Sequence, residues 1–202
     1  MKSTIVRACI TLLDIDPPIW RRIEVPADFT LARLHEVIQR VMGWQDYHLH
    51  HFDIQGVRYG RPSPDDAFDD RKIADERSLK LGTLIGEANR VFSYAYDYGD
   101  DWQLAVVLES SAPARPDAIY PRVIGGARAG APEDVGGPWG YAEFLEALAD
   151  EDHERHDEML EWIGSGFDPE HFEKNLINAA LAKLGPRSAR RKGKPHTRQN
   201  VN

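Results

Sequence analysis

The segment FSYAYDYGDDWQLAVVLE, residues 92–109, decides the fold, because it contains two alternating apolar runs joined by a turn. Apolar side chains occupy every second position on both sides of that turn: Phe92, Tyr94, Tyr96 and Tyr98, then Leu104, Val106 and Leu108. This period is typical of β-strands with one buried face. Residues 97–101 supply the aspartates and the glycine that tight turns favour. The pattern therefore predicts a β-hairpin.

The segments before this hairpin predict further strands and one helix. Residues 3–13 and 20–25 read as two strands that flank the turn Asp16-Pro17-Pro18. Thr30 is a suitable helix N-cap, Gly43 is a suitable C-terminal stop, and apolar residues recur between them at helical spacing. Residues 50–54 and 57–59 flank Gln55-Gly56 and predict a short hairpin.

The pattern becomes helical after Trp139, where three apolar stripes follow one another, and Asp168-Pro169 predicts the start of the last helix. Strands come first and helices last, which favours an α+β fold. Two strands, a helix and more strands predict a β-grasp-like mixed or antiparallel sheet with the C-terminal helices packed on it. We expect one domain over residues 1–184, helical from about 139 to 184, and a disordered basic tail over 185–202.

Charge is distributed unevenly along the 202 residues, whose formal net charge is −8. All 33 acidic residues lie within residues 1–182, and residues 183–202 contain seven Lys or Arg. The acidic body argues against a DNA recombinase. The tail is expected to touch nucleic acid only weakly, through its phosphates. The residues that would do so are Arg187, Arg190, Arg191, Lys192 and Lys194.

The single cysteine, Cys9, excludes an intramolecular disulfide and a cysteine-based zinc cluster within one chain. This fits a cytoplasmic protein. The first residues lack the pattern of a signal peptide, and no run of about 18 apolar residues occurs. We therefore expect no association with a membrane.

The segment PEDVGGPWGY, residues 132–141, is the best candidate for a functional motif. A turn does not require Glu133 and Asp134 to be acidic, and Gly136-Gly137 indicates positive φ or a close backbone approach. Asp134 has two interpretations. It belongs to a binding site, or it caps a backbone or bonds Arg21 or Arg22.

His48 and His50 would share one face of the chain if residues 48–52 are extended. Such a pair would supply half of a zinc or iron site, completed by Asp97, Asp100 or Glu133. The simpler interpretation is that these histidines bond backbone carbonyls and that the aspartates form the turn. We expect no metal and no other cofactor. Trp102 is expected in the core rather than on a stacking surface.

Seven stretches resemble the Ri-plasmid open-reading-frame-three family, also labelled transposon-passenger TnpR-like proteins. They are PPIWRRIEVP (17–26), LHEVIQRVMGW (34–44), HLHHF (48–52), YDYGDDW (96–102), YPR (120–122), PEDVGGPWGY (132–141) and GFDPEHF (166–172). The resemblance covers the chain as far as the third C-terminal helix. It implies a cytoplasmic α+β protein, often carried on plasmids or mobile elements, without an established activity.

The chain departs from the family pattern at four positions. Val123 and Gly130 stand where many relatives have cysteines, Ala131 replaces a proline, and Leu104 replaces a histidine. Metal or thiol chemistry that depends on those positions in relatives is not expected in this chain.

Three functional hypotheses follow from these residues. The first is a non-enzymatic binding or interaction module with a protein partner, whose surface contains His48, His50, Asp97, Asp100, Trp102, Glu133 and Asp134. The second is a metal-dependent hydrolase that uses His48, His50 and the nearby carboxylates. The third is a nucleic-acid-associated protein that acts through its tail. Sequence motifs of the common catalytic frameworks are absent, which favours the first.

Overall fold

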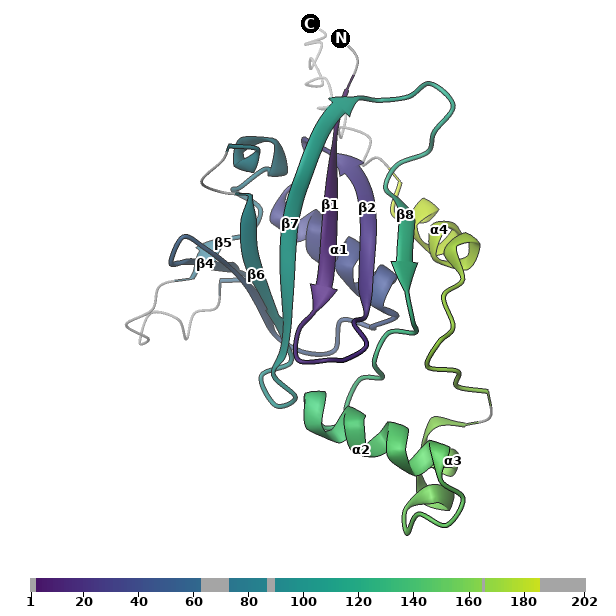
Figure 1. Ribbon diagram of the computed structural model, residues 1–202. Coiled ribbons are helices and arrows are strands. Elements are labelled where there is room, and N and C mark those ends of the chain that lie inside the picture. The colour runs from purple at the N-terminus through teal and green to yellow at the C-terminus, as the bar shows by residue number, and fades with distance from the viewer. Residues whose placement is uncertain (1–2, 63–72, 87–89, 165, 186–202) are drawn as a thin grey trace, which may run out of the picture.

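The structure is a computed structural model, which describes residues 3–62, 73–86, 90–164 and 166–185. An eight-stranded sheet dominates it (Figure 1), in the order β5-β4-β3-β6-β7-β1-β2-β8. The neighbouring strands are antiparallel except for β4 and β5, which are parallel. The strands are β1 (Thr4–Leu12), β2 (Trp20–Pro26), β3 (His50–Ile54), β4 (Val57–Gly60), β5 (Ala74–Asp75), β6 (Val91–Tyr96), β7 (Trp102–Pro113) and β8 (Arg122–Ala127).

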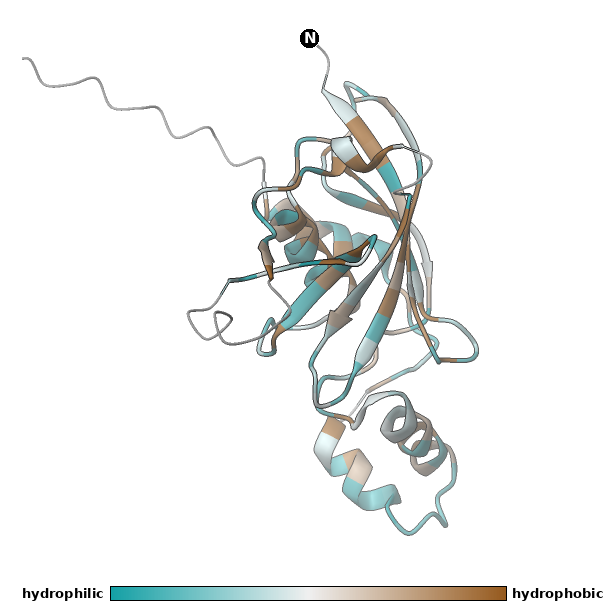
Figure 2. Cartoon of the chain, turned by 90° about the vertical axis from the view of Figure 1, so that its left-hand side faces the viewer, coloured by the Kyte–Doolittle hydropathy of each residue, from teal (hydrophilic) through white to brown (hydrophobic). Residues whose placement is uncertain are grey.

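Four α-helices accompany the sheet. Helix α1 (Leu31–Met42) lies across one face of the sheet, and α4 (Lys174–Ala182) lies beside β8. Helices α2 (Gly137–Ala149) and α3 (His156–Ile163) form a pair beyond one end of the sheet, as both Figure 1 and Figure 2 show. A short 3-10 helix, η2 (Leu81–Leu84), precedes β6. The chain is therefore a mixed α+β protein, as predicted, whereas the β-grasp arrangement is not confirmed.

The core lies between the sheet and α1. Every second residue of β1 is fully buried on the side that faces the helix, and the same alternation buries one face of β6 and β7. The residues involved are Val6, Ala8, Ile10, Leu12, Phe92, Tyr94, Tyr96, Leu104, Val106 and Leu108. The predicted hairpin is thus present, although Tyr98 lies beyond the strand and is exposed.

Helix α1 begins and ends where the sequence predicts. Thr30 is the N-cap residue, but its side chain makes no capping hydrogen bond. Gly43 ends the helix with φ 84°, and its N–H donates to the carbonyl of Gln39. The buried side of this helix contains the polar residues His35 and Gln39 as well as its apolar stripe.

One prediction about a chain segment is wrong, and one strand was missed. The last helix does not begin at Asp168-Pro169, because those residues form a turn in which Asp168 accepts the N–H of Glu170, and α4 starts at Lys174. Strand β8 was not predicted. It contains two adjacent glycines, which weaken any local strand pattern. Its extended conformation is stabilised instead by hydrogen bonding to β2.

One buried guanidinium joins the sheet to the end of α1. Arg21, on β2, donates from Nε to the carbonyl of Val41 at 2.8 Å. Its NH1 and NH2 donate to the carbonyls of Ala127 at 2.6 Å and Arg128 at 2.7 Å. The ring of Phe172 packs against the guanidinium at 5.1 Å. Burial lowers the pKa of Arg21 to about 10, so it remains charged at neutral pH.

Replacement of Arg21 by lysine is expected to destabilise the protein by roughly 2–5 kcal/mol, because an ammonium cannot reach the same carbonyls and leaves buried acceptors unpaired. Urea unfolding of the two proteins measures the difference. Arg22→Lys is the matched control, because Arg22 is partly exposed and pairs with Glu109 at 2.9 Å. That change should cost less than about 1 kcal/mol, and equal losses in the two variants would contradict the role assigned to Arg21.

Candidate functional site

Three loops meet at the end of the sheet next to α2: residues 43–49 after α1, the turn 97–101 between β6 and β7, and residues 128–136 before α2. They contain most of the polar residues that the sequence analysis singled out. The loops are far apart in sequence, so the site exists only once the sheet has formed.

The turn 97–101 is held by the side chain of its first residue. Asp97 has φ 57°, and its Oδ1 accepts the N–H groups of Gly99 at 3.0 Å and Asp100 at 3.4 Å. The interpretation of these aspartates as turn residues therefore fits the geometry. One carboxylate oxygen of Asp97 is occupied by this turn, and the other faces His48.

The segment after β8 is fixed against this turn. Asp134, Gly136 and Gly137 all have positive φ, and the N–H of Gly136 donates to Oδ2 of Asp100 at 3.2 Å. A Cβ on Gly137 would overlap the carbonyl oxygen of Asp100. Both reasons proposed for the glycine pair, positive φ and close backbone approach, therefore apply.

Glu133 connects the same segment to the loop after α1. The Tyr96 hydroxyl donates to Glu133 Oε1, and the backbone N–H of Gln45 donates to Oε2 at 2.9 Å. Beside them, Trp44 Nε1 donates to the carbonyl of Ala131 at 2.9 Å. Burial and the Glu133 carboxylate raise the pKa of Tyr96, so its hydroxyl stays protonated as the donor.

His48 lies between two carboxylates. Its Nε2 is 3.4 Å from Oδ2 of Asp97 and 3.2 Å from Oδ1 of Asp134. This nitrogen is inaccessible to solvent and has no well-aligned hydrogen bond among the described residues. Asp134 thus faces His48 and does not bond the guanidinium groups of Arg21 or Arg22, which bind backbone carbonyls and Glu109 instead.

His50 belongs to a different cluster. Strand β3 starts only at His50, so His48 is outside the strand and the two rings do not share a face as expected. Nε2 of His50 is 2.8 Å from Oε2 of Glu76, and its ring stacks on His35 with centroids 3.5 Å apart and planes 6° apart. Both histidines are almost fully buried.

In this stack, His35 makes a hydrogen bond at each of its ring nitrogens. Nδ1 is 2.7 Å from the Tyr94 hydroxyl, and Nε2 is 2.9 Å from Oδ1 of Asp46. Arg61 donates to Oδ2 of Asp46 at 2.7 Å. Of this cluster only His50 was predicted as a site residue, although a histidine and a glutamine within the apolar stripe of a helix are the signal that would have found His35.

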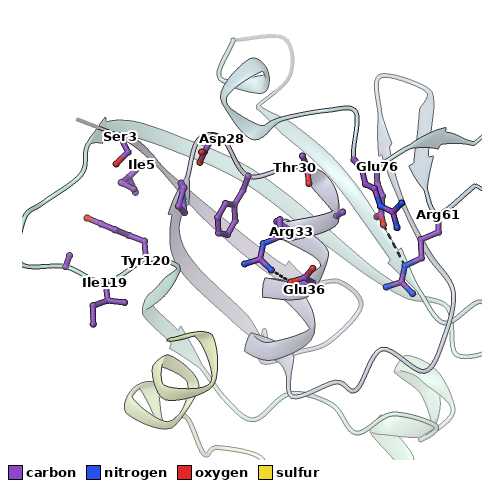
Figure 3. Close-up of a pocket in the computed structure, with 15 residues that line it drawn as sticks. Ser3, Ile5, Asp28, Thr30, Arg33, Glu36, Arg61, Glu76, Ile119 and Tyr120 are labelled. Carbon is purple, nitrogen blue, oxygen red and sulfur yellow. Dashed lines mark hydrogen bonds and ion pairs between the residues drawn. The ribbon is translucent and has the colours of Figure 1, made fainter. Parts of the chain in front are cut away.

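A surface cavity of about 950 Å³ runs from this second cluster along α1 (Figure 3). Arg61 and Glu76 line one end, Arg33 lies in the middle, and Ile119 and Tyr120 line the other end. None of the residues around His48 lines it. The cavity and the three-loop site are therefore separate features of the surface.

Other predicted residues have structural surroundings. Trp102 is fully buried, and the centroid of its ring lies 6.2 Å from that of Trp44. The Nδ1 atoms of His153 and His156 bond backbone groups of Arg155 and Ala147. The tail residues from Arg187 to Lys194 lie outside the described residues. Among the residues that the structure describes, no helix has the length and apolar character needed to cross a membrane.

The positions that depart from the family pattern are structural in this chain. Leu104 and Val123 are buried in the core, and a Cβ on Gly130 would overlap the carbonyl oxygen of Met42. A cysteine at residue 130 would require the backbone to move.

Acid is expected to destabilise the protein through His35. Burial, and next the neighbouring His50, lower the pKa of His35 to about 4, whereas an unfolded histidine titrates near about 6.5. Between these values the unfolded chain binds the proton and the native chain does not, so stability falls as pH falls through this window, with a slope of up to about 1.4 kcal/mol per pH unit. Urea unfolding from pH 7 to pH 4 should show a shallower dependence for His35→Phe, and identical slopes would contradict the assignment.

Comparison with known proteins identifies relatives along nearly the whole chain. The model of the plasmid pRiA4b ORF-3-like protein family matches residues 4–176. An uncharacterized protein of Sinorhizobium fredii, y4hQ, is 40% identical over 192 residues, which cover 95% of this chain and 97% of that protein. The crystal structure of MM3350, a protein of unknown function from Methanosarcina mazei, has a TM-score of 0.78 and 38% identity. That match covers 87% of this chain and 98% of the other. The chain belongs to the plasmid pRiA4b ORF-3-like family.

Proposed function

We propose that the protein is a cytoplasmic, non-enzymatic interaction module that binds a basic, partly apolar segment of a protein partner on the α2–α3 pair. The observation that carries the proposal is Trp139, near the start of α2, whose surface is 89% exposed. Exposed tryptophans are enriched among the residues that dominate binding energy at protein interfaces.

A second tryptophan lies at the same end of the pair. Trp162, on α3, is 45% exposed and lines a pocket of about 150 Å³ together with Gly140, the residue after Trp139. Val135 and Met159 supply apolar walls to this pocket, and its charged lining consists of two carboxylates, Asp134 and Glu158, and one guanidinium, Arg155. Its size and chemistry suit one apolar or long basic side chain of a partner.

The acidic charge of the α2–α3 pair favours a basic partner. Residues 137–164 contain nine acidic residues and a single arginine. That arginine, Arg155, is paired with Glu143 at 2.8 Å and with Glu158 at 2.9 Å, and it offsets one of the nine negative charges, which leaves an excess of eight. An acidic surface attracts a basic segment and repels nucleic acid and anionic lipid.

Aromatic contacts hold α2 and α3 together, so the surface that they form is preorganised. The ring of Phe144 on α2 packs edge-on against Trp162 at 5.7 Å and against Phe167 at 5.3 Å. The pair also projects beyond the sheet (Figure 2), which leaves it accessible to a partner. A preformed surface reduces the ordering cost of binding.

The test is fluorescence anisotropy with a labelled peptide of alternating lysine and leucine. We expect saturable binding that weakens with added salt and falls at least about tenfold in Trp139→Ala, as for other interface anchors. Leu176→Ala is the matched control, because Leu176 is an exposed apolar residue of α4. Equal binding of a glutamate–leucine peptide, or equal losses in both variants, would refute the proposal.

A further inference from the structure

Three metal-ligand atoms converge from three separate loops at the site around His48. They are Nε2 of His48, Oδ2 of Asp97 and Oδ1 of Asp134, and all lie within 4.8 Å of one another. We propose that these atoms bind one divalent transition-metal cation. This site goes beyond the interaction surface and does not require it.

The two separations that involve His48 are those of ligands around a common ion. Ligand atoms about 2.1 Å from a metal lie about 3.0 Å apart at a right angle and about 3.4 Å apart at a tetrahedral angle. The His48 nitrogen is 3.2 Å from the Asp134 oxygen and 3.4 Å from the Asp97 oxygen. These distances exceed the usual 2.7–2.9 Å or so of a charge-assisted hydrogen bond.

His48 Nε2 is a buried polar atom whose bonding the described residues leave incomplete. The atom is inaccessible to solvent and has no hydrogen bond of good geometry among the described residues, whereas buried polar atoms normally have one. A cation between His48 and the carboxylates satisfies this nitrogen and neutralises Asp97, whose side chain is almost fully buried.

Each ligand is held in place by groups that leave its ligating atom directed at the site. The turn N–H groups occupy Oδ1 of Asp97 and leave Oδ2 for the site. The backbone of Asp134 adopts φ 61°, and the bond from Gly136 to Asp100 fixes its segment. The ring of His48 contacts Tyr96 edge-on at 5.7 Å. Hydrogen bonds that orient a ligating carboxylate, as the turn does for Asp97, are characteristic of metal sites.

A second group with suitable atoms, His35, Asp46 and His50, lacks these properties. Arg61 already places a guanidinium 2.7 Å from Asp46 and 3.3 Å from Nε2 of His35. The two imidazole rings are stacked in parallel planes, so their in-plane lone pairs cannot converge on one ion. The Arg61 guanidinium already supplies the positive charge at this group. The proposal is therefore confined to the site around His48.

The ligand set selects the class of metal. One imidazole nitrogen and two carboxylate oxygens suit zinc, manganese and ferrous iron better than calcium or magnesium. Three protein ligands leave coordination positions for water or another molecule, and the Asp134 side chain is 65% exposed.

The experiment is calorimetric titration of the full, tag-free, chelator-stripped protein with Zn²⁺ and with Mn²⁺, in the absence of any peptide. We expect saturation at a single equivalent. Asp134→Asn should lower the affinity at least about tenfold, and His48→Gln should do the same. Asp134 is exposed, so its replacement leaves the fold intact, which circular dichroism verifies.

His51→Gln is the matched control, because His51 lies next to the site in sequence but its Nδ1 is 3.0 Å from the Tyr98 hydroxyl. It should bind the metal as the unmodified protein does. Unchanged affinity in Asp134→Asn, an equal loss in His51→Gln, or no saturable binding of either ion would overturn the proposal. Because no peptide is present, these outcomes do not depend on the proposed interaction surface.

Discussion

The buried guanidinium of Arg21 is the interaction on which the rest of the structure depends. Removing a guanidinium from water costs several kcal/mol, which strong hydrogen bonds to backbone carbonyls offset. One of those carbonyls belongs to Val41 in the last turn of α1, where helical carbonyls lack intrahelical donors. Two others, of Ala127 and Arg128, mark the point where the chain leaves β8. The same cation therefore fixes the origins of two of the three loops that form the site.

Local patterns were sufficient to predict the parts of the fold that local interactions determine. The hairpin of β6 and β7 and the limits of α1 follow from apolar spacing and from Gly43. Strand β8 and the start of α4 did not follow, because β8 is ordered by pairing with β2 and the residues after Asp168 close a turn. The position of α2 and α3 beyond the sheet also depends on contacts between distant segments.

Most residues of the candidate site could be named from the sequence, but which of them contact one another could not. Acidic residues that a turn does not need drew attention to Glu133 and Asp134, and the structure places Asp134 against His48. The pairing of His48 with His50 was inferred from their spacing in an extended segment, but the strand begins one residue after Leu49. The stacked partner of His50, His35, comes from a helix, and no spacing rule relates a helix to a strand.

Asp134 contributes to two features of the surface, since it faces His48 on one side and lines the small pocket beside Trp162 on the other. Two ligands that contact the same side chain are thermodynamically coupled when the binding of one shifts the position of that side chain. By reciprocity, the factor by which a cation changes the affinity for a peptide equals the factor by which that peptide changes the affinity for the cation. Coupling between the proposed ion and the proposed partner therefore requires no long-range conformational change, because Asp134 belongs to both proposed sites.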